Sequence, residues 1–150
     1  DLPCMDDDDM RRGRPTVHKV FGVPAATAAG MAMVPLAARA AADSAAEIGL
    51  SSAVAGEIVR TLMRASGATG MIGGQLLDLE GEGTALDLLQ LERIHRSKTG
   101  ALIEAALRIG GLAAGAPAEQ LRAFEHYGAS VGLAFQIADD VLDITATTDQ

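Results

Sequence analysis

Residues 124–144 read FEHYGASVGLAFQIADDVLDI, and this stretch decides the fold class. Its apolar residues recur at steps of three and four, the spacing of one face of an α-helix. They are Phe124, Tyr127, Val131, Ala134, Phe135, Ala138, Val141 and Leu142. No alternating strand pattern competes with this signal elsewhere in the 150 residues, and no internal repeat recurs at a fixed period. The sequence therefore predicts an all-α protein.

Glycine, proline and serine divide the rest of the chain into further helices. An Ala-rich helix is expected over residues 25–42, perturbed near Pro35, and Ser51 or Ser52 is expected to cap the next helix. Residues 86–114 predict one or two helices followed by a turn. Glycine in a helix costs about 1 kcal/mol relative to alanine. Several glycines together therefore indicate a break or a close approach of another backbone, as at Gly67, Gly70, Gly73 and Gly74.

The composition limits the class of protein. The 150 residues are enough for one domain, or part of one, with its own core. A net charge of −8 argues against binding of nucleic acids, whose phosphates require an excess of Lys and Arg. The single cysteine, Cys4, cannot form an internal disulfide, and we expect a cytoplasmic protein. The chain opens without Met and without a secretory leader, inside an acidic motif, so we expect a piece of a longer protein.

Residues 20–38 carry no charge over 19 residues, which is close to the length that spans a membrane. The stretch contains Pro24, Pro35, Gly22 and Gly30, and its apolar content is largely alanine. For these reasons we expect a tightly packed, buried helix and no transmembrane segment.

A cluster of aspartates, Asp139, Asp140 and Asp143, lies near the end of the stretch quoted first. Asp139 and Asp143 are four apart and share a helix face, and Gln136 precedes Asp139 by three. The plain interpretation is an acidic helix end exposed to solvent. Two features favour a site instead. Like charges four apart cost stability unless something neutralises them, and the apolar flanks indicate the wall of a cavity.

A second cluster of aspartates opens the chain in the string DLPCMDDDDMRRGRPT, residues 1–16. Its carboxylates, from Asp1 and residues 6–9, are followed at once by Arg11 and Arg12. Carboxylate oxygens suit hard cations such as Mg²⁺, and the arginine fork fits phosphate oxygens in pairs. Taken alone, the string is equally typical of a disordered acidic patch with surface salt bridges. Together the two clusters predict a site for a metal-bridged polyphosphate.

The string HRSKTGALI, residues 95–103, places Lys98 and Thr99 just before an apolar helical run. The plain interpretation is a solvated lysine and an ordinary helix cap. Beside an apolar wall, the pair would instead anchor an anionic ligand that carries an apolar tail.

Four motifs, taken in order and spacing together, resemble those of the trans-isoprenyl diphosphate synthases, the group that includes farnesyl and geranylgeranyl diphosphate synthases. They are DLPCMDDDDMRRGRPTVHKVFG at 1–22, GGQLLDL at 73–79, IHRSKTGALI at 94–103 and GLAFQIADDVLDI at 132–144. The resemblance covers essentially the whole chain, as the middle half of such a synthase. It implies an all-α bundle of helices around a central cavity, the isoprenoid synthase fold, truncated at both ends. Residues 1–150 would form a partial domain of a protein that is a homodimer at full length.

The resemblance implies a Mg²⁺-dependent prenyltransferase. Such an enzyme condenses an allylic diphosphate with isopentenyl diphosphate into a longer linear trans-prenyl diphosphate, and metals with basic side chains stabilise the leaving diphosphate. Asp6 and Asp139 would bind the metal. Asp1, Asp140 and Asp143 would bind it directly or through water.

The same resemblance implies roles in substrate binding and catalysis. Arg11 would contact the allylic diphosphate, and Arg12 the isopentenyl diphosphate. Lys98 would hold the allylic diphosphate. Thr99 and Gln136 would face the allylic cation together with Lys98, because hydroxyl and amide oxygens stabilise a cation without attacking it.

The chain also departs from the family pattern. Only the second of the two aspartates that open the first motif is present, as Asp1, and the chain stops at Gln150, before a Gly-Lys segment that contacts diphosphate. Met31 stands where the family often has an aspartate. We therefore expect little or no activity from this piece alone, because one metal ligand and much of the cavity wall are missing.

Three alternatives remain open at this point. Met31 slightly favours a catalytically inactive subunit that binds an active prenyl synthase partner, whereas the intact second motif and the basic residues oppose it. A class I terpene cyclase or head-to-head synthase shares the metal chemistry but lacks these paired motifs. An acidic helical bundle without a ligand would leave the two clusters and the arginines as coincidence. The sequence does not give the product chain length or the preferred allylic starter.

Overall fold

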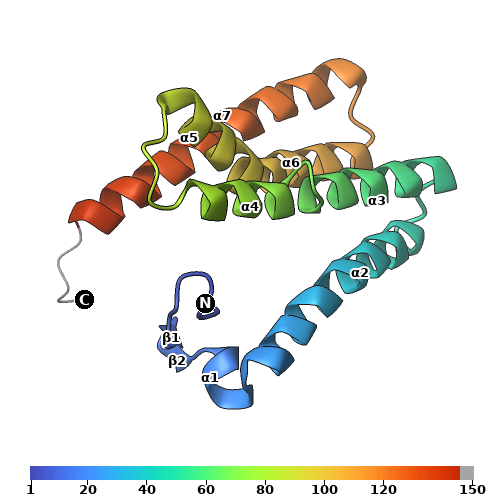
Figure 1. The fold of residues 1–150 in the computed structure, drawn as a ribbon. Helices are drawn as coiled ribbons and strands as arrows, with labels where there is room; N and C mark the ends of the chain where they lie inside the picture. The colour runs from blue at the N-terminus through green and yellow to red at the C-terminus, as the bar shows by residue number, and fades with distance from the viewer. Residues whose placement is uncertain (146–150) are drawn as a thin grey trace. The chain divides into compact units, whose positions relative to one another are not determined.

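The structure, a computed structural model, describes residues 1–145, with the side chains of residues 143 and 144 outside the description. The metal-ligand role predicted for Asp143 therefore lies outside the described residues. The chain divides into two compact units, Asp1–Ala40 and Ala41–Gln150, and each is considered by itself. Nearly all regular structure in the described part of the chain is helical (Figure 1), which confirms the predicted all-α class.

The first unit opens with a loop and a short β-hairpin. Strands β1, Met10–Arg11, and β2, Arg14–Pro15, pair in antiparallel orientation. The two residues between them, Arg12 and Gly13, have φ angles of 51° and 74°, and a type I′ turn needs positive φ at both central positions. The sequence does not predict these strands, because strands of two residues are too short to produce an alternating pattern.

Two helices follow the hairpin. Helix α1 covers Val17–Phe21, and the long helix α2 covers Val23–Glu47, where the sequence predicts a helix over residues 25–42. Pro24 lies in the first turn of α2, where a backbone N–H has no intrahelical partner in any case. Pro35 lies inside the helix and does not end it.

Helix α2 is exposed, and the prediction of a buried helix is wrong. Met31, Met33 and Leu36 are 73%, 66% and 62% exposed, and Ala45 is the buried residue of this helix. The prediction fails because alanine makes a helix apolar on every side. Such a composition selects no face for packing, and burial needs a second surface that the helix itself does not supply.

By length and composition alone, α2 is also able to cross a membrane. A single helix of this kind is weak evidence, because core helices of soluble proteins and signal sequences pass the same test. The absence of a transmembrane segment therefore stays a prediction.

The second unit is a set of packed helices. They are α3 Ser52–Ser66, α4 Met71–Gly81, α5 Leu88–His95, η1 Arg96–Gly100, α6 Ala101–Ala113 and α7 Ala118–Thr145. Helix α6 packs along α3 and α7 (Figure 1), and η1, a single π-helical turn, packs against α4 and α7. Turns of this rare type occur frequently at functional sites. The buried apolar residues of this unit are Ala45, Ile58, Ala65, Ile94 and Ala105.

Local sequence signals set several helix ends. The backbone N–H of Val54 donates to Oγ of Ser51 at 3.3 Å, so the prediction of Ser51 as a cap is confirmed. At the start of α5, Asp87 and Gln90 exchange side-chain and backbone hydrogen bonds of 2.8 and 2.9 Å, a capping box. Gly115, with φ of 71°, follows the end of α6 in the predicted turn.

Two glycines let other backbones approach η1. A Cβ on Gly74 of α4 would lie 2.2 Å from the backbone nitrogen of Lys98. A Cβ on Gly132 of α7 would lie 2.7 Å from the Cα of Gly100. Neither position has room for a side chain. Both predicted alternatives are found at the glycine-rich stretch: the helix breaks between Ser66 and Met71, and Gly74 lies against another backbone. Helices α4 and α7 hold the backbone of η1 from two sides.

Helix α7 packs partly through small residues, and much of the apolar stripe by which the sequence identifies it is exposed. Gly128 and Gly132 are buried, whereas Tyr127, Phe135 and Leu142 are 61%, 56% and 59% exposed. An apolar stripe ordinarily faces a core. Here Phe124, at the start of the stripe, lies against Gly111 of α6, and glycines further along α7 let neighbouring backbones come close.

Replacing Gly74 by alanine is expected to destabilise the protein. The added Cβ would meet the backbone of Ser97 and Lys98, which cannot move aside as the end of a side chain can, and overpacking of this kind costs about 1–3 kcal/mol. Urea denaturation measures the change. Gly110→Ala in α6 is the matched control: its Cβ meets nothing within 4 Å, and it is expected to stabilise by about 0.5–1 kcal/mol. Equal unfolding free energies for the two variants would contradict the close contact.

Candidate functional site

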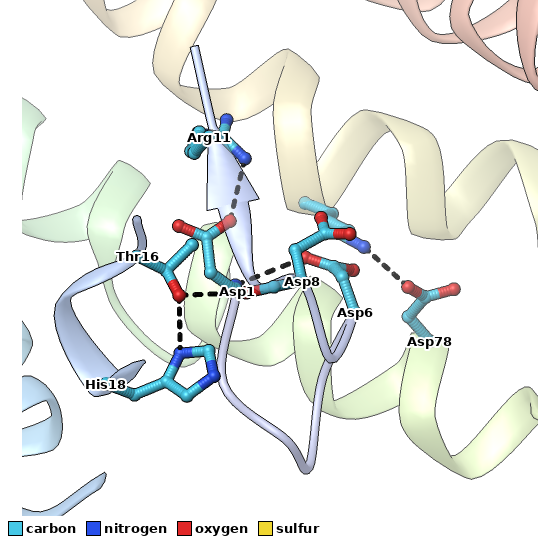
Figure 2. A network of polar contacts seen from close by, with 8 residues as sticks. Asp1, Asp6, Asp8, Arg11, Thr16, His18 and Asp78 are labelled. Atoms are coloured by element: carbon cyan, nitrogen blue, oxygen red, sulfur yellow. Dashed lines mark hydrogen bonds and ion pairs between the residues drawn. The ribbon is translucent and has the colours of Figure 1, made fainter. Parts of the chain in front are cut away.

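Three carboxylates of the first unit come together in the loop before β1. One oxygen each of Asp1, Asp6 and Asp8 lies within 4.8 Å of the others, and Figure 2 shows Asp6 and Asp8 next to each other. A set of carboxylate oxygens is the donor chemistry that Mg²⁺ prefers, so these residues fit the predicted metal; exposed acidic groups are also common without one. Asp8 was missed, because a run of four aspartates does not indicate which of them point the same way.

A buried threonine anchors this loop. Thr16 is 3% exposed, and its hydroxyl donates to the backbone carbonyl of Asp8 at 2.9 Å (Figure 2). Its backbone N–H donates to the carbonyl of Asp9, also at 2.9 Å. Nδ1 of His18 lies 3.1 Å from the hydroxyl oxygen. Because the one hydroxyl hydrogen goes to a carbonyl, His18 supplies the Nδ1 proton. The loop is therefore held through its backbone, which leaves the carboxylate of Asp8 for a ligand.

The two arginines after the loop have different surroundings. Nη1 of Arg11 lies 2.9 Å from Oδ1 of Asp1, and the two side chains are 60% and 30% exposed, so this ion pair is solvated and weak. Arg12 is exposed in the hairpin turn, and no hydrogen bond or ion pair of its side chain is found within the described residues. Both guanidinium groups are accessible, and their contacts with diphosphates stay predictions.

In the second unit, the structure brings together Thr99 and Gln136, which the resemblance implies for one site. Oγ1 of Thr99 donates to Oε1 of Gln136 at 2.8 Å, and Nε2 of Gln136 donates to Oδ1 of Asp140 at 3.1 Å. Nε2 of His95 lies 3.0 Å from Oδ2 of Asp140. His95 is buried, and sequence reasoning missed it because no helical spacing links this histidine to Asp140.

The neighbouring aspartates Asp139 and Asp140 differ in their surroundings. Both oxygens of Asp140 have partners, Gln136 on one and His95 on the other. Asp139 is exposed, and its carboxylate has no hydrogen bond or ion pair with the side chains that the structure describes. Asp139 therefore has free coordination capacity, whereas a metal at Asp140 would compete with two existing bonds. Asp139 and Asp6 belong to different units, so their convergence on one metal stays a prediction.

Lys98 is already paired. Its Nζ lies 2.6 Å from Oδ2 of Asp78, which is drawn in Figure 2, and the two side chains are 33% and 40% exposed. Asp78 comes from α4, one helical turn after Gln75 in the GGQLLDL motif. The motif by itself predicts no role for Asp78. The contact between Gly74 and the backbone of Lys98 explains the pairing, because it fixes α4 against η1.

A cavity of 610 Å³ in the second unit contains none of the predicted site residues. Helices α3, η1 and α6 line it with arginines and glutamates. Arg108 pairs with Glu57 and Glu125, and the hydrogen bonds of Arg60 and Arg108 hold the pKa of Glu57 below its ordinary value. Several of the charges that line this cavity are therefore paired with one another.

A smaller apolar cavity of 310 Å³ lies between α5 and α7. Leucines and Ile137 form most of its lining, and His95, Asp140 and Val141 border it. The sequence predicts a cavity wall at the apolar flanks of the second acidic cluster. That prediction is confirmed for Ile137 and Val141, which lie in the two flanks and line this cavity.

The chain is similar over its full length to known prenyl diphosphate synthases. The family model described as polyprenyl synthetase matches residues 1–150, and the chain belongs to this family. A farnesyl diphosphate synthase of Escherichia coli (strain K12) is 47% identical over 150 residues, which are 99% of this chain and 50% of the relative. The chain therefore spans about half the length of this curated relative.

Solved structures agree with this assignment. An FPP/GFPP synthase from Zymomonas mobilis has a TM-score of 0.90 and 38% identity, over 99% of this chain and 53% of that one. A geranyltransferase from Helicobacter pylori, complexed with magnesium and isoprenyl diphosphate, has a TM-score of 0.89 and 35% identity, over 97% of this chain and 47% of that one. The fold is the all-α fold of these synthases, as the sequence predicts.

The half-buried Glu104 makes a pH-dependent contribution to stability. Burial first, and the nearby charge of Glu125 second, raise the pKa of its carboxyl group above the ordinary value. A carboxyl whose pKa is raised on folding stabilises the folded state below its unfolded pKa, and this contribution is lost as the pH rises through the folded pKa. Glu104→Gln is therefore expected to be more stable than the parent at about pH 7 and equally stable at about pH 4.

Chemical denaturation at the two pH values tests this expectation. Glu119→Gln, at an exposed position of the same unit, is the control and is expected to shift stability by less than about 0.5 kcal/mol. A stability difference for Glu104→Gln that is the same at both pH values would refute the cause given above.

Proposed function

We propose that the protein, at its full natural length, is a prenyltransferase that condenses an allylic diphosphate with isopentenyl diphosphate into a longer linear trans-prenyl diphosphate. The observation that carries this proposal is the grouping of Asp1, Asp6 and Asp8, with Arg11 paired to Asp1 and Arg12 next in the chain. Such a group combines donors for a divalent cation with donors for phosphate. The names of the relatives support the substrates, and the Helicobacter pylori complex supports Mg²⁺.

The reaction breaks the bond between the allylic carbon and a diphosphate oxygen, and the diphosphate leaves with the bonding electrons. The double bond of isopentenyl diphosphate then forms a carbon–carbon bond to the allylic cation, and one proton is lost. Mg²⁺, when bound, supplies neutralisation of the charge on the leaving diphosphate. Asp1, Asp6 and Asp8 would hold it because their carboxylate oxygens lie together, and Asp139 because its exposed carboxylate is not engaged with the described side chains.

Basic and neutral side chains have separate tasks in this scheme. Arg11, Arg12 and Lys98 bind and orient phosphate oxygens. The Lys98–Asp78 pair is partly exposed, so a diphosphate, which carries more charge than one carboxylate, competes effectively for Lys98. Thr99 and Gln136 present oxygen atoms to the cation, which they stabilise without reacting.

A chain-extension assay tests the proposal. The full-length protein is given Mg²⁺, an allylic diphosphate and labelled isopentenyl diphosphate, and the labelled prenyl product is measured. Asp139→Ala, and separately a chelator, are expected to lower turnover by at least about a hundredfold, because the leaving diphosphate loses its counter-charge.

Glu119→Ala is the matched control for that assay. It removes an exposed carboxylate from the same helix, α7, at its other end, and is expected to keep parental turnover. A parent protein that extends no allylic diphosphate in the presence of Mg²⁺ would refute the proposed function. Full turnover by Asp139→Ala would remove this residue from the metal site.

We also propose that the full-length protein is a cytoplasmic homodimer without a transmembrane segment and without nucleic-acid partners. The exposed Met31, Met33 and Leu36 support a protein interface. The net charge of −8 argues against nucleic acids, and the single exposed cysteine fits a reducing compartment. Light scattering tests the dimer, and cell fractionation tests the cytoplasmic location.

The alternative of a catalytically inactive subunit gains no support from relatives that are named as synthases.

A further inference from the structure

Four side chains of the second unit form one continuous series of hydrogen bonds, here named the His95 relay. Its members are His95 at the end of α5, Asp140 and Gln136 on α7, and Thr99 in η1. From Nε2 of His95 to Oδ2 of Asp140 the distance is 3.0 Å, and from Oδ1 of Asp140 to Nε2 of Gln136 it is 3.1 Å. Oε1 of Gln136 lies 2.8 Å from Oγ1 of Thr99.

The carboxylate of Asp140 fixes the direction of every bond in the relay. An ionised carboxylate only accepts hydrogen bonds, so both His95 and Gln136 donate to it. Once the NH₂ group of Gln136 faces Asp140, its carbonyl oxygen faces the other way, toward Thr99. The hydroxyl of Thr99 must then donate, because a carbonyl oxygen has no proton to give.

The direction of that last bond decides what Thr99 offers to a ligand. With its hydrogen given to Gln136, the hydroxyl presents lone pairs, the negative end of its dipole. A reversed Gln136 amide would instead donate to Thr99 and leave the hydroxyl hydrogen to point outward. The first arrangement stabilises a carbocation, and the second opposes it.

His95 holds Asp140 in the orientation that this requires. The His95 side chain is 8% exposed, whereas the Asp140 side chain is 42% exposed. The buried partner therefore orients the more exposed one. Both residues border the apolar cavity of 310 Å³, and a hydrogen bond to a charged group is stronger than one between neutral groups.

We propose that His95 is a positioning residue: through Asp140 and Gln136 it sets the Thr99 hydroxyl dipole so that its negative end faces the cationic carbon of the allylic substrate. The catalytic part of this inference rests on the proposed function. It assigns Asp140 to orientation of the amide, and leaves coordination of the metal to Asp139.

The first experiment tests the relay without reference to activity. In full-length protein with ¹⁵N-labelled histidine, the Nε2–H of His95 is expected to give a resolved resonance protected from solvent exchange. Asp140→Asn is expected to shift this resonance or speed its exchange, because an amide that also bonds to Gln136 replaces the carboxylate. His126→Leu, which removes an exposed histidine of α7, is expected to leave it unchanged. The relay is overturned if Nε2 of His95 carries no proton, or if its resonance and exchange rate do not respond to Asp140→Asn.

The second experiment tests its catalytic role. His95→Leu is expected to lower kcat for chain extension by about tenfold or more, since the dipole acts on the charge that develops in the transition state. The KM values for both diphosphates and the Mg²⁺ concentration at half-maximal rate are expected to stay within about twofold. His95→Gln, whose amide NH₂ reaches a position similar to Nε2, is expected to recover most of the lost rate.

Each remaining outcome decides against one part of the inference. The positioning role is overturned by an unchanged kcat in His95→Leu, by equal losses of kcat in the Leu and Gln variants, or by a raised Mg²⁺ requirement. If His95→Leu does not fold, Asp140→Asn carries the same kinetic test, since it is isosteric and partly exposed. A parent protein without chain extension refutes the proposed function and the catalytic role with it, whereas the NMR comparison still decides whether the relay exists.

Discussion

The close approach of three backbones at η1 is the constraint on which the candidate site of the second unit depends. Gly74 brings α4 onto the backbone of Lys98, and Gly132 brings α7 onto Gly100. These contacts set where the side chains of Lys98 and Thr99 begin. The Lys98–Asp78 ion pair and the Thr99–Gln136 hydrogen bond then join the same elements, α4 and α7, to η1. Glycine is needed at these positions because the neighbouring backbone occupies the space that a side chain would fill.

Much of the fold followed from local patterns in the sequence. The period of residues 124–142 predicts α7, Ser51 caps α3, and the glycines near Gly74 mark a close contact. The burial of the side chains did not follow, because an Ala-rich helix such as α2 has no preferred face and because much of the apolar stripe of α7 is exposed. The hairpin at residues 10–15 was not predicted, because its strands are too short to produce an alternating pattern.

Residue type alone predicts the chemistry of the candidate site, whereas the partners of each side chain depend on surroundings that the sequence does not show. Aspartates and arginines at the family spacing predict a metal and phosphate site. The difference between Asp139 and Asp140 arises because one carboxylate is exposed and the other lies between His95 and Gln136. Thr16 holds the acidic loop through a backbone carbonyl, and His18 contacts the hydroxyl of Thr16. No side-chain pattern in the sequence predicts such contacts. Such contacts become visible only with tertiary structure.

The turn of the hairpin restricts how the sequence can vary at Arg12. Its φ angle of 51° is one that asparagine and glycine adopt more readily than a long side chain does. Asparagine would satisfy the backbone but remove the guanidinium group, and lysine would keep a charge but lose the planar fork. Arginine keeps the guanidinium group at the cost of a less favourable turn. A library designed to stabilise this hairpin would therefore enrich variants that lose this group, and with it the phosphate contact proposed for Arg12.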